Sequence, residues 1–226
     1  KLLKIELSED KIKKFYNYMN LLIEWNQKIN LTSITDPKEI ILKHFIDSLT
    51  INKYIKENTK MIDVGTGAGF PGIPLKILRD DIEIILLDSL NKRIKFLDIV
   101  IEELKLNKIS TIHSRAEDIG RDEKYREKFD YSTSRAVANL STLAEYLIPL
   151  VKIKGEVIAM KGAEIKEELE TSKKSINVLG GKLNSVEEFC LPESNMKRNV
   201  IIIQKETKTP NKFPRKAGLP SKEPIN

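Results

Sequence analysis

The sequence predicts an α/β fold in which helices cover both faces of a mainly parallel sheet. Three observations support this prediction. From Lys60 onward, short apolar runs alternate with amphipathic helical patterns, as they do in chains of strand–helix–strand units. A glycine-rich turn directly follows the first of these runs. The residues before Lys60 show only helical periodicity, which predicts an N-terminal helical extension.

The N-terminal extension reads as two helices. Ser8 is a suitable N-cap for a helix over residues 8–28, whose apolar residues recur at spacings of three and four. Asp36-Pro37 then opens a second helix that runs to about Tyr54. We expect residues 1–58 to form a cap that packs on the main domain rather than an independent domain.

The main domain, residues 59–205, contains the alternating pattern. Five strand–helix units are followed by two strands without a full helix between them, which predicts a seven-stranded, mainly parallel sheet with an antiparallel edge. This is the methyltransferase variant of the doubly wound fold. Residues 206–226 should form a basic, proline-containing, extended tail. Strands are expected at residues 61–64, 83–87, 111–113, 129–134, 156–160, 186–190 and 200–204, and the clearest helices at 91–106, 138–152 and 163–177.

The composition is that of an ordinary globular protein. Hydrophobic residues make up 40% of the 226 residues and charged residues 32%. No apolar run approaches the length of a membrane span, and the first ten residues do not resemble a secretory signal. The chain begins with Lys rather than Met, as expected if starting residues are missing. With one cysteine and two histidines, neither a disulfide nor a metal site is expected; Cys190 should be a buried small hydrophobe, and a reducing cytoplasm is the expected setting.

The net charge of +6 is concentrated at the C-terminal end. Residues 197–226 contain eight basic and two acidic residues, whereas the first 196 residues contain 31 of each. An anionic partner such as nucleic acid is therefore expected to dock near that end. The alternative is a solvated basic terminus that contacts nothing specific.

The glycine-rich turn, MIDVGTGAGFPG at residues 61–72, can be interpreted in several ways. Residues 67–72 fit G-x-G-x-x-G literally, the fingerprint of dinucleotide binding. However, Asp63 would repel phosphates and suit a cationic ligand, and Pro71 and Pro74 remove N–H donors that would cradle a phosphate. S-adenosylmethionine, a phosphate-free nucleoside with a sulfonium, fits better. A glycine-rich turn without any ligand is the remaining alternative.

Residues just past each strand would lie at the ligand-binding edge of such a sheet. Asp88 follows the second strand and could accept hydrogen bonds from the ribose of either cofactor; its alternative role is an N-cap. After the third strand, the N–H of Ala116 and an acceptor on Glu117 could read the edge of an adenine. Glu117 could equally cap a helix.

Arg135 follows the fourth strand, at the position that faces the transferred group. Methylases of exocyclic amines usually carry Asn or Asp followed by Pro-Pro-aromatic here, and carbon-5 pyrimidine methylases need a cysteine nucleophile; this sequence has neither at that position. An arginine suits an acceptor that needs no base and no covalent intermediate. Its alternative role is a surface ion pair. His44, near Asp47 on the second helix, is interpreted as a packed, hydrogen-bonded residue rather than a catalyst.

Taken together, these segments resemble the bacterial glucose-inhibited division protein B family, whose members are 16S ribosomal RNA guanine-N7 methyltransferases. The resemblance runs essentially from end to end. It is more specific than a lone glycine motif because it includes the GFPGIP continuation of the turn and a PRK-x-G-x-P tail. The matching stretches are Asn30-Leu31-Thr32, HFIDSL from His44, IDVGTGAGFPGIPLKI from Ile62, LLDSLNKR from Leu86, SRAED from Ser114, SRAVANL from Ser134, RNVIIIQK from Arg198 and FPRKAGLPSKEPIN from Phe213.

The resemblance implies a class I methyltransferase Rossmann-like fold, with S-adenosylmethionine as cofactor and 16S ribosomal RNA in the small ribosomal subunit as partner. We expect a cytoplasmic monomer without a metal. Arg135 is the expected catalytic residue, shaping the cofactor site and contacting guanine O6 or a phosphate. The expected cofactor contacts are Gly65, Gly67, Gly69, Phe70, Asp88, Ala116, Glu117 and Arg135.

Guanine N7 has an in-plane lone pair and no proton, so catalysis would rest on alignment and desolvation rather than on a general base. An acidic side chain could read the N1/N2 edge of the base. Deleting residues 208–226 is expected to weaken RNA binding and spare cofactor binding. The rival interpretations are an NAD-dependent oxidoreductase and a non-catalytic, RNA-binding ribosome-assembly factor. The expected RNA-binding residues are Lys197, Arg198, Arg215 and Lys216, followed by Lys92, Arg93 and Arg115.

Overall fold

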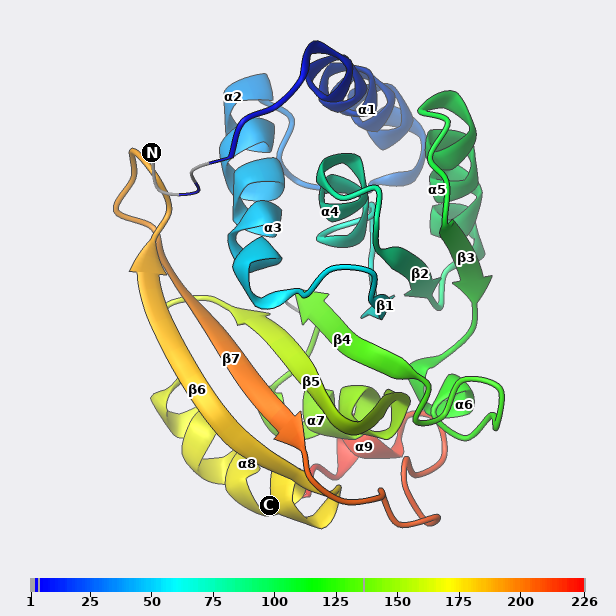
Figure 1. The fold of residues 1–226 in the computed structure, drawn as a ribbon, viewed down its shortest axis with the longest axis vertical. Coiled ribbons are helices and arrows are strands. Elements are labelled where there is room, and N and C mark those ends of the chain that lie inside the picture. Colours follow the sequence, from blue (N-terminus) through cyan, green and yellow to red (C-terminus); the bar gives the residue numbers. More distant parts are fainter. Residues whose placement is uncertain (1–2, 4, 136, 226) are drawn as a thin grey trace.

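Seven strands form one sheet in the computed structural model, which describes residues 3, 5–135 and 137–225 (Figure 1). The strand order is β3-β2-β1-β4-β5-β7-β6. Neighbouring strands from β3 to β5 are parallel, whereas β7 runs antiparallel to both β5 and β6, as the sequence predicts. The strands are β1 (Lys60–Val64), β2 (Glu83–Asp88), β3 (Ile109–His113), β4 (Phe129–Arg135), β5 (Val151–Lys161), β6 (Gly181–Cys190) and β7 (Lys197–Lys205).

Local capping explains where the N-terminal helices begin. The hydroxyl of Ser8 accepts from the N–H of Lys11 at the start of α1 (Glu9–Ile29), and the carboxylate of Asp36 caps α2. The second predicted helix is divided into four segments, one of them a π-helix, η1. These segments are α2 (Pro37–Ile40), η1 (Ile41–Ile46), α3 (Asp47–Leu49) and η2 (Thr50–Tyr54). The later helices are α4 (Gly72–Leu78), α5 (Asn91–Glu103), α6 (Ala116–Ile119), α7 (Leu140–Leu147), η3 (Ile148–Leu150), α8 (Lys166–Val178) and α9 (Leu219–Lys222).

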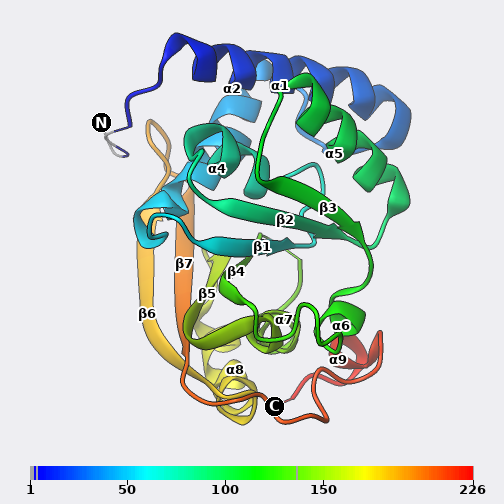
Figure 2. The ribbon, with the colours of Figure 1, turned by 45° about the vertical axis from the view of Figure 1, so that its right-hand side comes forward.

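Alternation along the strands supplies two hydrophobic cores, one on each face of the sheet. In β1, Met61 belongs to the core that contains residues of α1, α4 and α5, whereas Ile62 belongs to the core that contains residues of α7 and α8. Figure 2 shows α1 to α5 on one side of the sheet and α7 to α9 on the other. Tyr18 and Leu22 of α1 are fully buried in the same core as Met61, so α1 packs directly on the main domain.

The predicted burial of Cys190 is wrong. This cysteine lies at the end of β6, which is the edge strand of the sheet, and it is exposed. Most residues of β6 have exposed side chains, in keeping with its position at the edge of the sheet.

Five residues of the chain lie outside the described residues. Residues 1, 2 and 4 belong to the predicted cap, residue 136 follows Arg135 in the SRAVANL stretch, and residue 226 ends the predicted tail. None of the helices in the described part of the chain combines the length and the apolar character needed to cross a membrane.

Candidate active site

The N–H groups of the turn after β1 donate hydrogen bonds to other groups of the protein. The amides of Gly65 and Thr66 both donate to the carbonyl of Leu87 on β2, at 2.8 and 3.1 Å. The amides of Gly67, Gly69, Phe70 and Gly72 also donate to oxygens of the protein. A pyrophosphate is recognised by free amides of such a turn. These six amides are already engaged, so the structure favours a ligand without phosphates.

Asp63 holds the turn from beneath. Its carboxylate is fully buried and accepts from the Thr66 hydroxyl at 2.7 Å and from the Gly72 amide at 2.9 Å. Burial raises the pKa of Asp63 to about 6, against the opposing effect of those two hydrogen bonds. The sequence interpretation was that Asp63 suits a cationic ligand. In the structure its carboxylate instead binds groups of the turn, and Asp63 does not line any of the three cavities described in the following paragraphs.

Two adjoining cavities lie over the turn, at the carboxyl ends of the parallel strands. The turn cavity has a volume of about 410 Å³ and the Glu117 cavity about 210 Å³, and both are bounded by Gly65 and Asp88. The turn cavity is also lined by Gly67, Phe70, Arg93 and Arg135, whereas the Glu117 cavity is lined by Arg115, Ala116 and Glu117. The sequence-predicted cofactor residues therefore gather around one continuous region. Gly69 is the exception: it lies behind the turn, where an added Cβ would meet Ile73 and Tyr18.

Asp88 is the acidic centre of this region. It is almost fully buried and accepts from the amides of Gly67 and Leu90, both at 2.9 Å, and from Arg93 at 3.2 Å. The bond to Leu90 is the local, capping-like role considered for this residue. Asp88 nevertheless lines both cavities. This is the position expected for an acid that accepts hydrogen bonds from ribose hydroxyls.

Glu117 is buried at the far end of the region. Its carboxylate accepts from the amide of Gly218, in the C-terminal tail, at 2.7 Å. It is not the cap of its own helix, because Arg115 occupies the N-cap position of α6. Sequence reasoning missed this contact with the tail, since the two residues lie 101 positions apart.

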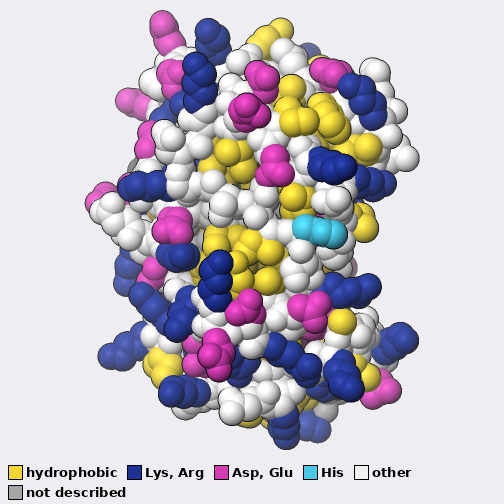
Figure 3. All heavy atoms as spheres, turned by 90° about the vertical axis from the view of Figure 1, so that its right-hand side faces the viewer, with side chains coloured by type: hydrophobic (Ala, Val, Ile, Leu, Met, Phe, Trp, Pro, Cys, Tyr) yellow, Lys and Arg dark blue, Asp and Glu magenta, His cyan; other side chains and the backbone are white. Residues whose placement is uncertain are grey.

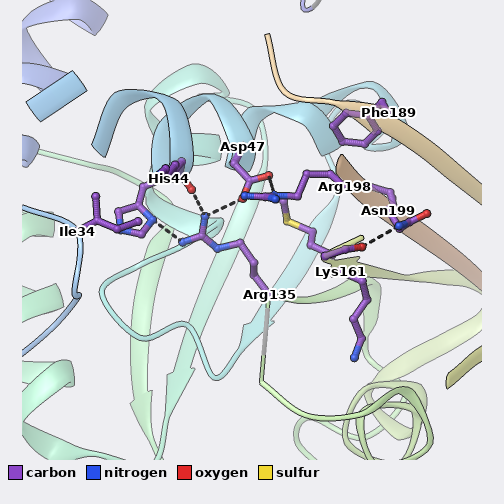
Figure 4. A pocket seen from close by; sticks show the side chains of 12 residues that line it. Ile34, His44, Asp47, Arg135, Lys161, Phe189, Arg198 and Asn199 are labelled. Atoms are coloured by element: carbon purple, nitrogen blue, oxygen red, sulfur yellow. Dashed lines mark hydrogen bonds and ion pairs between the residues drawn. The ribbon is translucent and has the colours of Figure 1, made fainter. Parts of the chain in front are cut away.

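Arg135 forms the wall between the turn cavity and a third cavity. Its guanidinium donates to the carbonyl of Lys43 at 2.9 Å and to the Asp47 carboxylate at 3.2 Å, and it lies 3.0 Å from Nδ1 of His44 (Figure 4). The side chain also lies over the ring of Phe70, 4.9 Å from its centroid. The alternative role of Arg135 as a surface ion pair is wrong, because only 15% of its side chain is exposed.

The hydrogen bonds assign the charge state of His44. Nδ1 faces a guanidinium, which can only donate, so Nδ1 is the acceptor and the neutral ring carries its proton on Nε2. Nε2 can then donate to the Thr32 hydroxyl at 2.8 Å. Burial, together with the positive charge of Arg135, lowers the pKa of His44 to about 4. His44 is therefore a neutral, fixed side chain, stacked on Phe70 with ring centroids 4.4 Å apart.

A π-helical segment presents His44 and Asp47 together. η1 contains His44, and Asp47 begins α3 directly after it. π-helical turns are rare in proteins, and those that occur are often found at functional sites. No sequence signal predicted this one. On the opposite side, Arg198 of β7 donates to Asp47 at 3.2 Å, so Asp47 accepts from two arginines.

The third cavity, the Asp47 cavity, has a volume of about 300 Å³ and shares His44 and Arg135 with the turn cavity. Met160, Phe189 and Val200 supply apolar walls, and Asp47 and Arg198 supply polar groups. Lys161 also lines it, but Figure 4 shows its amine turned away from Asp47, and it pairs with Glu168 at 2.6 Å. An apolar cavity with a few fixed polar groups is typical of a binding site for a small organic group.

The predicted RNA-binding residues fall into two groups. Lys92, Arg115, Lys197 and Lys216 are exposed, although Lys197 pairs with Glu188. Arg93, Arg198 and Arg215 are committed to Asp88, Asp47 and Glu145 respectively.

The basic residues of the C-terminal end are thus partly structural, and Lys205 is buried against Glu127. In Figure 3 acidic and basic side chains mix over the upper part of the face that it shows. Basic ones predominate near its lower end, where α8, α9 and the tail lie.

Solved structures with a similar fold are methyltransferases or related proteins. A SAM-dependent methyltransferase from Aquifex aeolicus aligns with a TM-score of 0.54 at 15% identity, covering 74% of this chain and 93% of that one. TYW2 from P. horikoshii in complex with MeSAdo aligns with a TM-score of 0.56 at 14% identity, covering 71% and 61%. At these identities the likeness shows the fold alone. The order and directions of the seven strands are those of the class I methyltransferase Rossmann-like fold.

The GidB family, described as rRNA small subunit methyltransferase G, matches residues 11–200. A protein from Acetivibrio thermocellus named ribosomal RNA small subunit methyltransferase G is 56% identical over 222 residues, covering 98% of this chain and 91% of that protein. One of the same name from Clostridium tetani is 52% identical over 223 residues, covering 98% and 93%. The chain belongs to the GidB family.

Proposed function

We propose that this protein transfers a methyl group from S-adenosylmethionine to N7 of a guanine in the 16S ribosomal RNA of the small subunit. The observation that carries the proposal is the shared wall of two cavities. Arg135 and His44 bound both the turn cavity, which suits the cofactor, and the Asp47 cavity, which suits a flat base. A transferred group must pass between two ligands that are held side by side.

The residues around the turn fit the cofactor. Asp88 offers a carboxylate to ribose hydroxyls, and Glu117 with the amide of Ala116 faces the position of the adenine. The amino-acid end of the cofactor carries a carboxylate, for which Arg93 and Arg135 are suitable partners at the turn cavity. Gly65, Gly67 and Phe70 form the close-fitting wall. When bound, S-adenosylmethionine supplies an electrophilic methyl group on a positively charged sulfur.

The residues of the Asp47 cavity fit an acceptor that needs no base. The two groups best suited to remove a proton, His44 and Asp47, both accept hydrogen bonds from Arg135. Guanine N7 has a lone pair and no proton, so nothing has to be removed before transfer. In this proposal Arg135 is the catalytic residue: it fixes the wall against which the cofactor and the base are aligned. Asp47 positions Arg135 and Arg198.

Binding of the RNA itself falls to exposed cations. Lys92, Arg115, Lys197 and Lys216 can contact phosphates without first breaking a buried ion pair. Arg198 can serve both the Asp47 cavity and the RNA, because it lines that cavity and 25% of its side chain is exposed. We place the reaction in the cytoplasm and expect the protein to act as a monomer.

The test is methyl transfer to a panel of acceptors. Purified protein is incubated with radiolabelled S-adenosylmethionine and small subunits that lack the modification, with large subunits and naked 16S RNA as comparisons. Label in the 16S RNA of small subunits or in naked 16S RNA is expected. Tight RNA binding without transfer would instead support the non-catalytic assembly factor, and binding of NADH with no affinity for S-adenosylmethionine would support the oxidoreductase.

A further inference from the structure

The C-terminal tail forms part of the wall of the Glu117 cavity. Gly218 and Ser221 line this cavity together with Asp88, Ala116 and Glu117. In Figure 2 the tail and α9 lie beside α6, the helix that contains Glu117, and beside α7. The sequence interpretation assigned the tail to RNA; the structure also places Gly218 and Ser221 of the tail in the wall of this cavity.

Strong contacts anchor the tail at this position. Arg215 donates to both oxygens of the buried Glu145, at distances from 2.7 to 3.1 Å. The hydroxyl of Thr142 donates to the carbonyl of Pro220 at 3.0 Å, and Phe213 is buried in the core on the α7 side. Arg126 donates to the carbonyl of Phe213 at 2.7 Å. The tail is thus built into the fold.

The contact between Gly218 and Glu117 links the tail to the cofactor site. Glu117 is only 4% exposed, and a buried carboxylate is costly unless hydrogen bonds compensate it. The Gly218 amide supplies one such bond to Oε1 and fixes the direction of the carboxylate. Gly218 makes this contact at φ +82°, a left-handed conformation that L side chains rarely adopt.

We infer that the tail is a positioning element for the nucleoside: the amide of Gly218 holds the Glu117 carboxylate in the orientation that accepts from the exocyclic amine of adenine. This inference rests on the proposed function, because it assumes an adenosine-containing cofactor. It reverses the expectation that removing the tail spares cofactor binding.

The test compares two ligands, S-adenosylhomocysteine and S-inosylhomocysteine, by calorimetry. The second lacks the exocyclic amine. The wild type should prefer the adenosyl ligand, by about tenfold for one hydrogen bond to a charged acceptor. A variant ending at residue 217 should bind the adenosyl ligand about tenfold more weakly and lose most of that preference. Lys222→Ala, on the exposed side of the tail, is the matched control and should match the wild type.

A second variant guards against misfolding of the truncated protein. In Gly218→Ala the added Cβ meets nothing within 4 Å, so only the left-handed backbone is strained. As the strained backbone relaxes, the amide of residue 218 should move away from Glu117, so the preference for the adenosyl ligand should fall with only a small drop in melting temperature. In a Glu117→Ala background, truncation should cause no further loss of preference, because both changes remove the same contact.

The outcomes separate this inference from the proposed function. Failure of the wild type to bind S-adenosylhomocysteine would reject the proposed function itself. Normal binding by the wild type, with an undiminished adenosyl preference in both tail variants, would reject only the role of the tail. Weaker binding of both ligands by the same factor in both tail variants would mean that the tail only stabilises the fold, and it too would overturn the inference.

Discussion

The Arg135 guanidinium donates to the Asp47 carboxylate at 3.2 Å, across a separation of 88 residues in the chain. This pair joins β4 to the N-terminal helices and builds the wall that two cavities share. The N-terminal helices therefore do more than cover the sheet: they supply His44 and Asp47 to the site.

Replacing Arg135 should affect turnover far more than folding. Arg135→Ala removes the donors that hold the wall, so the rate of methyl transfer should fall by about 10²–10³-fold. Arg135→Lys keeps the charge but not the planar fork, and it should recover only part of the rate. Transfer kinetics measure the loss, and near-ultraviolet circular dichroism checks the fold. An unchanged rate in Arg135→Ala would remove this residue from the site.

Removing Asp47 should destabilise the protein through the arginines it leaves behind. Asp47→Ala leaves Arg135 and Arg198 without their shared partner, at a cost of about 3–5 kcal/mol. Urea unfolding measures this loss. The double variant Asp47→Ala, Arg198→Ala should be less destabilised than the sum of the single variants, because one unpaired charge is gone. Strict additivity would show that Asp47 and Arg198 are not energetically coupled.

His44 should give the protein an acid-sensitive component of stability. Its folded pKa of about 4 lies below the ordinary value of 6.5. The unfolded chain therefore binds more protons in this window, and the stabilisation present above pH 6.5 is lost as the pH falls toward 4, by about 3 kcal/mol. His44→Asn keeps an acceptor for Arg135 but cannot ionise. In urea unfolding at a series of pH values, this variant should lack that loss; an identical pH profile would contradict the assignment.

Ionisation of Asp63 should change stability with pH in the direction opposite to that of His44. Its folded pKa of about 6 lies above the ordinary value of 3.8. The native protein therefore binds more protons between these values, and stability falls as the pH rises from about 4 to 6, by about 3 kcal/mol. Asp63→Asn keeps an acceptor for Thr66 and Gly72 and should remove that fall. In the wild type the two effects oppose each other, so only the single variants reveal them. If Asp63→Asn and His44→Asn changed the pH dependence of stability in the same direction, both pKa assignments would be refuted.

Exposed and buried lysines of the C-terminal end should differ in their effect on RNA binding. Lys216→Ala should weaken binding and reduce the slope of log affinity against log salt by about 1. Lys205→Met is the matched control, because this lysine is fully buried against Glu127. It should lower stability and leave the salt slope unchanged. Equal slopes in Lys216→Ala and the wild type would remove Lys216 from the interface.

The sheet and the turn were predictable because their signals are local. A glycine-rich stretch after an apolar run, and Asp88 about one strand–helix unit later, are visible in short windows of sequence. The prediction that Asp63 suits a cationic ligand was wrong. The residue lies at the expected end of β1, but the sequence does not show which way its carboxylate points.

The network around Arg135 was not predictable beyond its individual members. Asp47 and Arg198 lie 151 residues apart, and the π-helix that presents His44 and Asp47 has no distinctive sequence signal. The PRK-x-G-x-P motif of the tail did carry a signal. Its charges pointed to RNA, whereas its glycine, Gly218, makes the contact with Glu117.

The most direct test of the whole account is chemical mapping of the methylated base. Borohydride reduction followed by aniline treatment converts 7-methylguanosine into a strand break. 16S RNA from small subunits treated with the protein and S-adenosylmethionine should break at one guanine, and RNA treated with Arg135→Ala should break far less. Incorporation of the methyl group without such a break would place it on another atom and contradict the account.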